Sequence, residues 1–194
     1  RRRFLQRHAQ KMEAETLRRE QEKRQWMNEM RQQMAMQQAT PEEHAAPQVE
    51  QIELHKQHHD IISFMEQLVE SYVAPDDKRV KLHFISPLKE QNIDFDAEQL
   101  RRAIHILLDN SVKFSPGDCR ITIGVACTDK SETQIQVADN GIGIRDEYKV
   151  HAFDRMPGAE GIGLDRVKDI VDAHGGSIRL EDNPGGGTVF IITL

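Results

Sequence analysis

The stretch from Thr133 to Ile144, TQIQVADNGIGI, constrains the fold most, because it joins a strand pattern to a glycine turn. Apolar and polar residues alternate up to Asp139, which predicts a β-strand with Asp139 on its apolar face. A carboxylate on that face needs a hydrogen-bond donor, because burying it unpaired is costly. Gly141 and Gly143 can adopt positive φ and leave no side chain over the carboxylate. The segment predicts either a pocket for a flat ligand with an exocyclic amine, such as adenine, or an ordinary hairpin, since Asn-Gly is a common turn signal.

A second pattern predicts a helix over about residues 97–115, with apolar residues at a period of 3.6. Asn110 lies at the edge of the apolar stripe, and Lys113 and Phe114 follow one turn later on the same rim. An amide oxygen can bind Mg²⁺, a lysine can contact phosphate oxygens, and an aromatic ring can cover a base. An amphipathic helix with a frayed polar end explains the same residues.

A third pattern is a glycine-rich run that leads into a helix expected over 162–174. Its glycines are Gly158, Gly161 and Gly163, and Leu164 opens the apolar stripe of the helix. Glycines at a helix start leave backbone N–H groups free to hold phosphate, and the helix dipole adds to the attraction. A dinucleotide-binding turn would also use glycines here, but it needs a strand directly before them, and the preceding residues do not form a strand pattern.

From Pro75 onward the chain alternates between strand and helix patterns. Strands are expected over residues 80–86, 92–95, 119–127, 132–139, 176–182 and 187–194. Strands with interspersed helices predict an α/β protein with a sheet covered by helices on one face. The last strand follows a glycine turn, which would place the Thr188 hydroxyl near the site.

The N-terminal part of the chain has a different composition. Residues 1–39 contain no Gly or Pro and are rich in helix formers, which predicts a helix that ends at Thr40-Pro41. A second helix is expected over about 48–73, and the two would form an antiparallel hairpin that pairs with a second copy. Three domains follow from this: a dimerisation helix and loop over 1–46, a second hairpin helix over 47–74, and an α/β domain over 75–194.

Charge is distributed unevenly. Residues 1–39 carry ten Lys and Arg against five Asp and Glu, whereas the remaining residues carry sixteen against twenty-seven. A basic start could bind nucleic acid, but its cations alternate with Glu and Gln, which favours a solvated helix and no nucleic-acid partner. The initial Arg1-Arg2-Arg3 fits a segment just inside a membrane. No apolar run approaches the roughly 20 residues of a membrane helix, so we expect a soluble piece of a larger, membrane-attached protein.

In this order and spacing, the motifs over residues 75–194 resemble the ATP-binding domain of sensor histidine kinases, within the family shared with gyrase, the Hsp90 chaperone and MutL. The run from 61 to 110 is especially similar to hybrid two-component kinases of Bacteroides-type bacteria. The resemblance implies a two-layer α/β sandwich with a mixed sheet, and ATP and Mg²⁺ as cofactors. It implies that Asn110 binds Mg²⁺ and Lys113 a phosphate, while Phe114 flanks the adenine. Asp139 would accept the adenine amino group. The other nucleotide-binding positions it implies are Gly141, Gly143, Phe153, Arg155, Gly158, Gly161, Gly163, Leu164 and Thr188.

By the same resemblance the chain is a protein-histidine kinase of a two-component system, dimeric through its N-terminal helices. It would pass the γ-phosphoryl of ATP to a histidine and then to a response-regulator receiver domain, as the cytoplasmic portion of a bacterial inner-membrane protein. Two departures favour an alternative, a weak or inactive nucleotide-binding module used for dimeric signal transfer. Ile106 stands where most relatives have a polar residue, and only seven residues separate Phe153 from Gly161. An ATPase clamp of the gyrase or Hsp90 type is disfavoured, because it needs an acidic base at the position of Ile106.

No histidine matches the family's phosphoacceptor motif. His59 has an acidic neighbour, but its distance of 51 residues to Asn110 is too short for a second helix between them. His8 lies at a more suitable separation without the motif, and His44 lies in the loop. Each is therefore interpreted as a surface histidine, and the phosphoacceptor is left unassigned.

Three histidines would share one face of the helix over 48–73 and could together bind a metal. They are His55, His58 and His59. No acidic or cysteine ligand is expected beside them, so a metal site is not the favoured interpretation.

Overall fold

The computed structural model describes residues 52–75, 78–115, 117–154 and 163–194. In chain order the elements are β1 (Gln57–Asp60), α2 (Ile61–Ser71), β2 (Val80–Ile85), β3 (Asn92–Phe95), α3 (Ala97–Lys113), β4 (Cys119–Cys127), β5 (Thr133–Asp139), α4 (Asp146–Lys149), α5 (Leu164–His174), β6 (Ser177–Asp182) and β7 (Thr188–Thr193). The helix expected over 1–39 lies outside the described residues. So do His8, His44, Arg155, Gly158 and Gly161.

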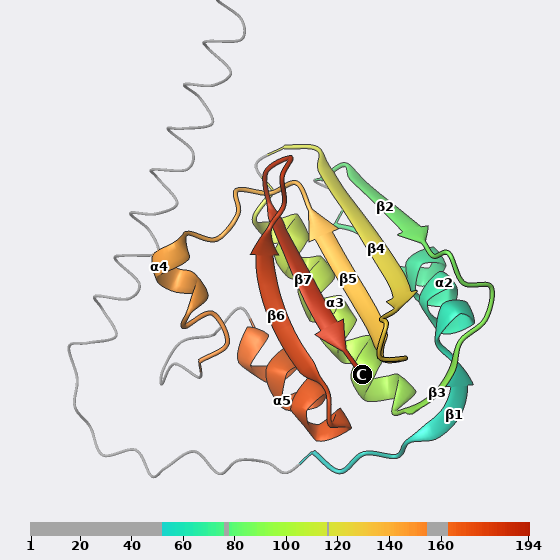
Figure 1. The fold of residues 1–194 in the computed structure, drawn as a ribbon. Helices are drawn as coiled ribbons and strands as arrows, with labels where there is room; N and C mark the ends of the chain where they lie inside the picture. Colours follow the sequence, from blue (N-terminus) through green and yellow to red (C-terminus); the bar gives the residue numbers. More distant parts are fainter. Residues whose placement is uncertain (1–51, 76–77, 116, 155–162) are drawn as a thin grey trace, which may run out of the picture. The chain divides into compact units, whose positions relative to one another are not determined.

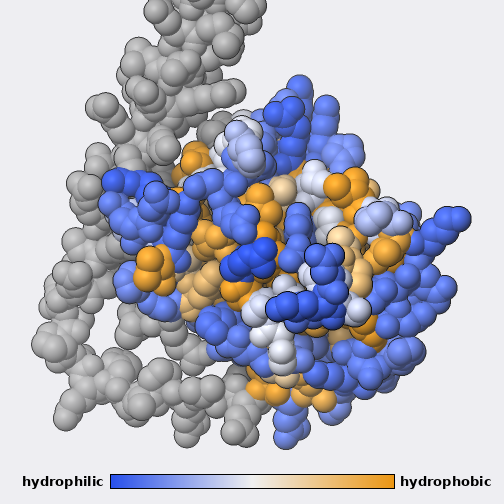
Figure 2. Space-filling view, viewed as in Figure 1, coloured by the Kyte–Doolittle hydropathy of each residue, from blue (hydrophilic) through white to orange (hydrophobic). Residues whose placement is uncertain are grey.

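The main sheet has five strands in the order β2-β4-β5-β7-β6. The β2 strand runs parallel to β4, and the other neighbouring pairs are antiparallel. Helices α3 and α5 lie side by side against one face of the sheet, behind the strands in Figure 1. This mixed sheet with helices on one face confirms the expected two-layer α/β sandwich. The opposite face, turned to the viewer in Figure 2, carries apolar residues among polar ones.

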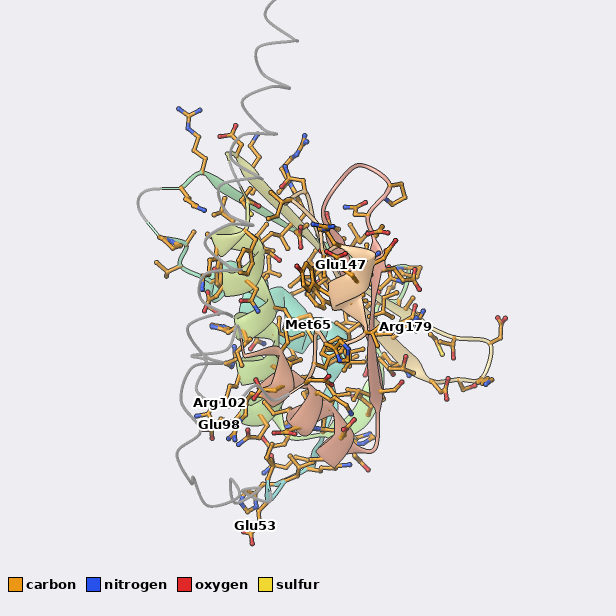
Figure 3. All side chains as sticks on the ribbon, turned by 90° about the vertical axis from the view of Figure 1, so that its left-hand side faces the viewer. Glu53, Met65, Glu98, Arg102, Glu147 and Arg179 are labelled. Carbon is orange, nitrogen blue, oxygen red and sulfur yellow. The ribbon has the colours of Figure 1, made fainter. Side chains whose placement is uncertain are left out.

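The hydrophobic core lies between the helices and the inner face of the sheet. Inward residues alternate along β4 and β5 as the sequence predicts, and Ile121, Ile123, Ile135 and Val137 are fully buried. The apolar stripe of α3 packs onto them. In Figure 3 Glu98 and Arg102 project from α3 on the side away from the sheet. The six predicted strands agree with the observed β2 to β7 to within one residue at each end.

The prediction of a helix over 48–73 is wrong for residues 52–60. That segment is extended, and β1 pairs antiparallel with β3 in a small second sheet. The α2 helix begins after Asp60, whose carboxylate accepts hydrogen bonds from the N–H groups of Ile62 (3.2 Å) and Ser63 (3.1 Å). A preceding strand thus ends at a capping residue, a boundary that helical periodicity alone does not reveal.

The apolar side chains of α2 are buried in the core of the α/β unit itself. Ile61, Met65 and Leu68 are fully buried and belong to the same cluster as the α3 stripe. Figure 3 shows Met65 in the interior. The stripe assigned to a dimerisation hairpin is therefore already covered within the unit that contains α3.

The histidines of this segment do not share a helix face. His58 and His59 are neighbours in β1, so their side chains point to opposite sides of the strand. His58 Nδ1 lies 2.8 Å from Asp94 Oδ1, and the His59 ring contacts the edge of Phe95. Among the described residues no cluster of metal-binding side chains is present. In the same part of the chain, no helix has both the length and the apolar character to cross a membrane.

Candidate functional site

The end of β5 buries a carboxylate, as the alternation predicts. Asp139 is 6% exposed. Its Oδ1 accepts hydrogen bonds from the N–H groups of Gly141 (2.8 Å) and Thr188 (3.1 Å). Its Oδ2 receives a longer bond, 3.3 Å, from the Ser111 hydroxyl. One oxygen is thus engaged by two amides, and the other retains capacity to accept a donor from a ligand.

Burial dominates the protonation of this group. It raises the pKa of Asp139, and the bonds from Gly141, Thr188 and Ser111 offset the rise only in part. A buried carboxylate without a full set of donors is less stable in its charged form, so a ligand that supplies a further N–H donor would be favoured.

Glycine backbone lies against the carboxylate from two sides. A Cβ on Gly141 would come within 2.9 Å of the Phe114 carbonyl oxygen and 3.0 Å of Asp139 Oδ1. A Cβ on Gly187, whose φ is +101°, would come within 2.6 Å of Asp139 Oδ1. Glycine at both positions therefore leaves no side chain of the two turns against Asp139 Oδ1. Gly143, at φ +74°, continues the turn after β5.

The end of α3 brings three predicted residues to the same turn. Asn110 is 8% exposed, Phe114 is half-buried and Lys113 is exposed. The Lys113 ammonium lies 5.4 Å from the centroid of the Phe114 ring. The Phe114 carbonyl accepts a hydrogen bond of 3.2 Å from the N–H of Ile142, which joins the helix end to the glycine turn.

The start of α5 is the third part of the site. Gly163 begins the helix in the left-handed conformation (φ +73°), and among the described residues no side chain caps it. The first N–H groups of α5 point along the helix axis toward the residues that precede it, at the positive end of the dipole, which is the arrangement that binds phosphate at a helix start. Leu164 is buried in the core, and Phe153 is partly buried and packs against the core cluster.

Sequence reasoning missed two residues of this site. Ser111 lies on the apolar side of the helix predicted over 97–115, and a hydroxyl at such a position signals a need for a polar partner. Gly187 belongs to a run of three glycines, and the sequence does not indicate which of them approaches the carboxylate. Only the pairing of β5 with β7 makes that distinction.

The fold of the described residues is that of histidine kinase catalytic domains. The catalytic domain of histidine kinase ThkA superposes with a TM-score of 0.62 at 20% identity, covering 74% of this chain and 95% of that one. The mycobacterial sensor histidine kinase MprB superposes with a TM-score of 0.59 at 24% identity, covering 72% and 96%.

Sequence comparison places the chain in one family. The model described as histidine kinase-, DNA gyrase B-, and HSP90-like ATPase matches residues 95–194. The chain belongs to this family. It is 32% identical over 139 residues to the signal transduction histidine-protein kinase/phosphatase MprB of Mycolicibacterium vanbaalenii, covering 67% of this chain and 28% of that protein. It is 28% identical over 153 residues to the adaptive-response sensory kinase SasA of Synechocystis, covering 74% and 40%. The chain thus spans less than half the length of these relatives.

Proposed function

We propose that this chain is the Mg·ATP-binding catalytic part of a two-component sensor histidine kinase. It would transfer the γ-phosphoryl of ATP to a histidine and then to the aspartate of a response regulator. The observation that carries the proposal is the buried Asp139, with Oδ1 engaged by two backbone amides and Oδ2 facing only the Ser111 hydroxyl among the described residues. A solved structure of the histidine kinase ShkA contains AMPPNP, which supports a nucleotide ligand for this fold.

In this proposal Asp139 selects adenine. The Oδ2 oxygen accepts the exocyclic amine, whereas a carbonyl at that place would put two acceptors against each other. The half-buried ring of Phe114 provides an apolar wall beside the base. Gly141 and Gly143 let the backbone approach the base closely, and Thr188 contributes its backbone N–H to fix the carboxylate.

Phosphate and metal binding are assigned to the two helix ends. Asn110 would supply an amide oxygen to Mg²⁺, which, when bound, neutralises charge on the phosphates. Lys113 is exposed at the same end of α3 and can reach phosphate oxygens. The start of α5 at Gly163 would hold phosphate through its N–H groups. Arg155, Gly158 and Gly161 are proposed to contribute from outside the described residues.

The partners of the proposed kinase are a second copy of the chain and a response regulator. The histidine kinase ThkA has been solved in complex with the response regulator TrrA. We assign dimerisation mainly to residues 1–46, because the apolar side chains of α2 are buried in the catalytic unit. The basic start of the chain fits attachment on the cytoplasmic side of a bacterial inner membrane.

One observation favours a second candidate, a nucleotide-binding module with weak or no transfer activity. Ile106 occupies the position one turn before Asn110, and its side chain packs against Gly163 and the core. An aliphatic side chain there can neither bind a metal nor orient a nucleophile, so the chain would bind ATP without efficient transfer.

Calorimetry and labelling test the two candidates in sequence. The chain should bind ADP with Mg²⁺, and Asn110→Ala should remove the dependence on Mg²⁺, whereas Asn92→Ala, on the exposed end of β3, should leave it unchanged. With labelled ATP, an acid-labile and base-stable mark on a histidine indicates the kinase, and binding without a mark indicates the inactive module. Absence of ADP binding by the unaltered chain would refute both.

A further inference from the structure

The end of α3 is held by a lysine from a distant segment. Lys78, just before β2, places its ammonium 2.6 Å from the Val112 carbonyl oxygen, 3.1 Å from that of Ser115 and 3.4 Å from that of Lys113. Carbonyls at a helix C-terminus have no partner within the helix and carry the negative end of its dipole. An ammonium offers three donors, and these three carbonyls match them in number.

The strand order holds Lys78 at this place. The adjoining Arg79 carbonyl accepts a hydrogen bond of 2.9 Å from the N–H of Cys119, and β2 then runs parallel to β4 from Val80 onward. The two strands therefore start side by side, at the end of the sheet where α3 stops (Figure 1). Strand pairing next to Lys78 fixes the position of its main chain, and the helix carbonyls fix the position of its ammonium.

The carbonyl of Phe114 is the exception in this run. This carbonyl accepts a hydrogen bond from the N–H of Ile142, in the turn after Asp139. The last turn of α3 is thus bonded on one side to Lys78 and on the other to the glycine turn. Loss of the ammonium would leave the carbonyls of Lys113 and Ser115 without this donor, and the turn that carries Lys113 and Phe114 would fray.

We infer that Lys78 is a positioning residue for nucleotide binding, which acts by fixing the end of α3. It holds the helix turn that carries the Phe114 ring and the Lys113 ammonium beside the glycine turn that follows Asp139. This inference rests on the proposed function, because it assigns to Lys78 the geometry of that same site. Lys78 itself bonds helix carbonyls, so its effect on the ligand passes through the two residues at the helix end.

The test compares Lys78→Met with Lys81→Met, an exposed lysine three residues along in β2. In the full chain, Lys78→Met should weaken ADP binding roughly tenfold, the effect of one or two hydrogen bonds left unmade, and Lys81→Met should leave it unchanged. Lys78→Arg should restore affinity to within about threefold, because a guanidinium also offers several donors.

Amide hydrogen exchange separates positioning from general destabilisation. In Lys78→Met the Ile142 amide, bonded to Phe114, should exchange faster relative to the Thr188 amide, bonded to Asp139. Equal acceleration of both amides, or ADP affinity equal to that of the unaltered chain, would overturn the inference while the proposed function stands. Failure of the unaltered chain to bind ADP would remove both. If Lys78→Met does not fold, Lys78→Gln keeps two of the three N–H donors on a shorter side chain and should give an intermediate affinity, and unchanged affinity there would also overturn the inference.

Discussion

Ile106 of α3 lies directly against Gly163 at the start of α5, so close that a Cβ on Gly163 would come within 2.9 Å of Ile106 Cγ2. Ile106, which departs from the family pattern, thus contacts Gly163, the glycine at the start of the proposed phosphate-binding helix. Because Ile106 also packs against the core, an apolar side chain at this position stabilises the junction of the two helices.

Gly163→Ala should destabilise the fold through two separable effects. Gly175 has φ +83°, and a methyl added there meets no atom within 4 Å. Gly175→Ala therefore measures the effect of backbone strain alone, a loss of about 1 kcal/mol in the free energy of unfolding. Gly163→Ala should lose about 1 kcal/mol more of the free energy of unfolding, because its methyl meets Ile106. A double-mutant cycle with Ile106→Ala, measured by urea unfolding, should recover the additional loss as a coupling energy. Equal losses for the two alanines would show that Ile106 does not crowd Gly163.

Asp139→Asn should bind adenine nucleotides weakly and yet unfold at a higher temperature. Burial raises the pKa of Asp139, so its stabilising contribution is present at low pH and is lost as the pH rises through that raised pKa. The amide avoids this loss, and its melting temperature at pH 7 to 8 should exceed that of the unaltered chain, with the gap narrowing toward pH 4. ADP affinity should fall about 10- to 100-fold, because the adenine amine would lose its acceptor.

A lower melting temperature for Asp139→Asn at pH 7 would contradict burial as the dominant influence on this carboxylate. Unchanged ADP affinity would contradict its role in recognising the base. Asp118→Asn, a substitution at an exposed aspartate, serves as the control and should alter neither quantity.

Adjacent glycines in the β6–β7 turn should respond very differently to alanine. Gly186 and Gly187 both have positive φ, +91° and +101°. A methyl on Gly186 meets no atom within 4 Å, whereas one on Gly187 would lie 2.1 Å from the Asp139 carbonyl oxygen. Thermal unfolding should show a loss of about 1 kcal/mol for Gly186→Ala from backbone strain, and more than about 3 kcal/mol for Gly187→Ala from strain and forced separation of the strands. Similar losses for both would indicate that the turn relaxes away from Asp139.

Asp96→Ala should show a stability loss that depends on pH. The Asp96 carboxylate caps α3 by accepting the N–H groups of Glu98 and Gln99, and it also accepts that of His55 at 2.8 Å. Burial alone would raise the pKa of Asp96, but these three donors outweigh it and leave the pKa below its ordinary value. A carboxyl group whose pKa is lowered by folding stabilises the protein at pH values above its pKa in the unfolded chain. This stabilisation is lost as the pH falls through its pKa in the folded protein.

The expected loss for Asp96→Ala is therefore about 2 kcal/mol at pH 7, the upper range for a helix cap. The difference from the unaltered chain should shrink in urea unfolding as the pH falls below about 4, near the ordinary carboxyl value. Asp94→Ala, at an exposed aspartate that contacts His58, provides the control and should change stability little at either pH. A loss for Asp96→Ala that stays constant with pH would assign the effect to packing.

The sequence by itself determined the local patterns. Period-2 alternation placed Asp139 inside, and period-3.6 spacing placed Asn110 at the rim of α3, because both depend only on the geometry of a single element. The order and spacing of the motifs that contain Asn110, Asp139, Gly163 and Thr188 carried the resemblance to a known family, and the family match over residues 95–194 agrees with it.

Tertiary structure decided what depends on partners far apart in the chain. The pairing of β5 with β7 selects Gly187 and Thr188 as neighbours of Asp139, and the start of β2 brings Lys78 to the end of α3. The strand over Gln57–Asp60 exists because β3 offers it a partner, and its four residues have no pattern that overrides helical spacing. Hydrogen bonds across 30 to 50 residues leave no periodic signal in the sequence, so only the folded chain reveals them.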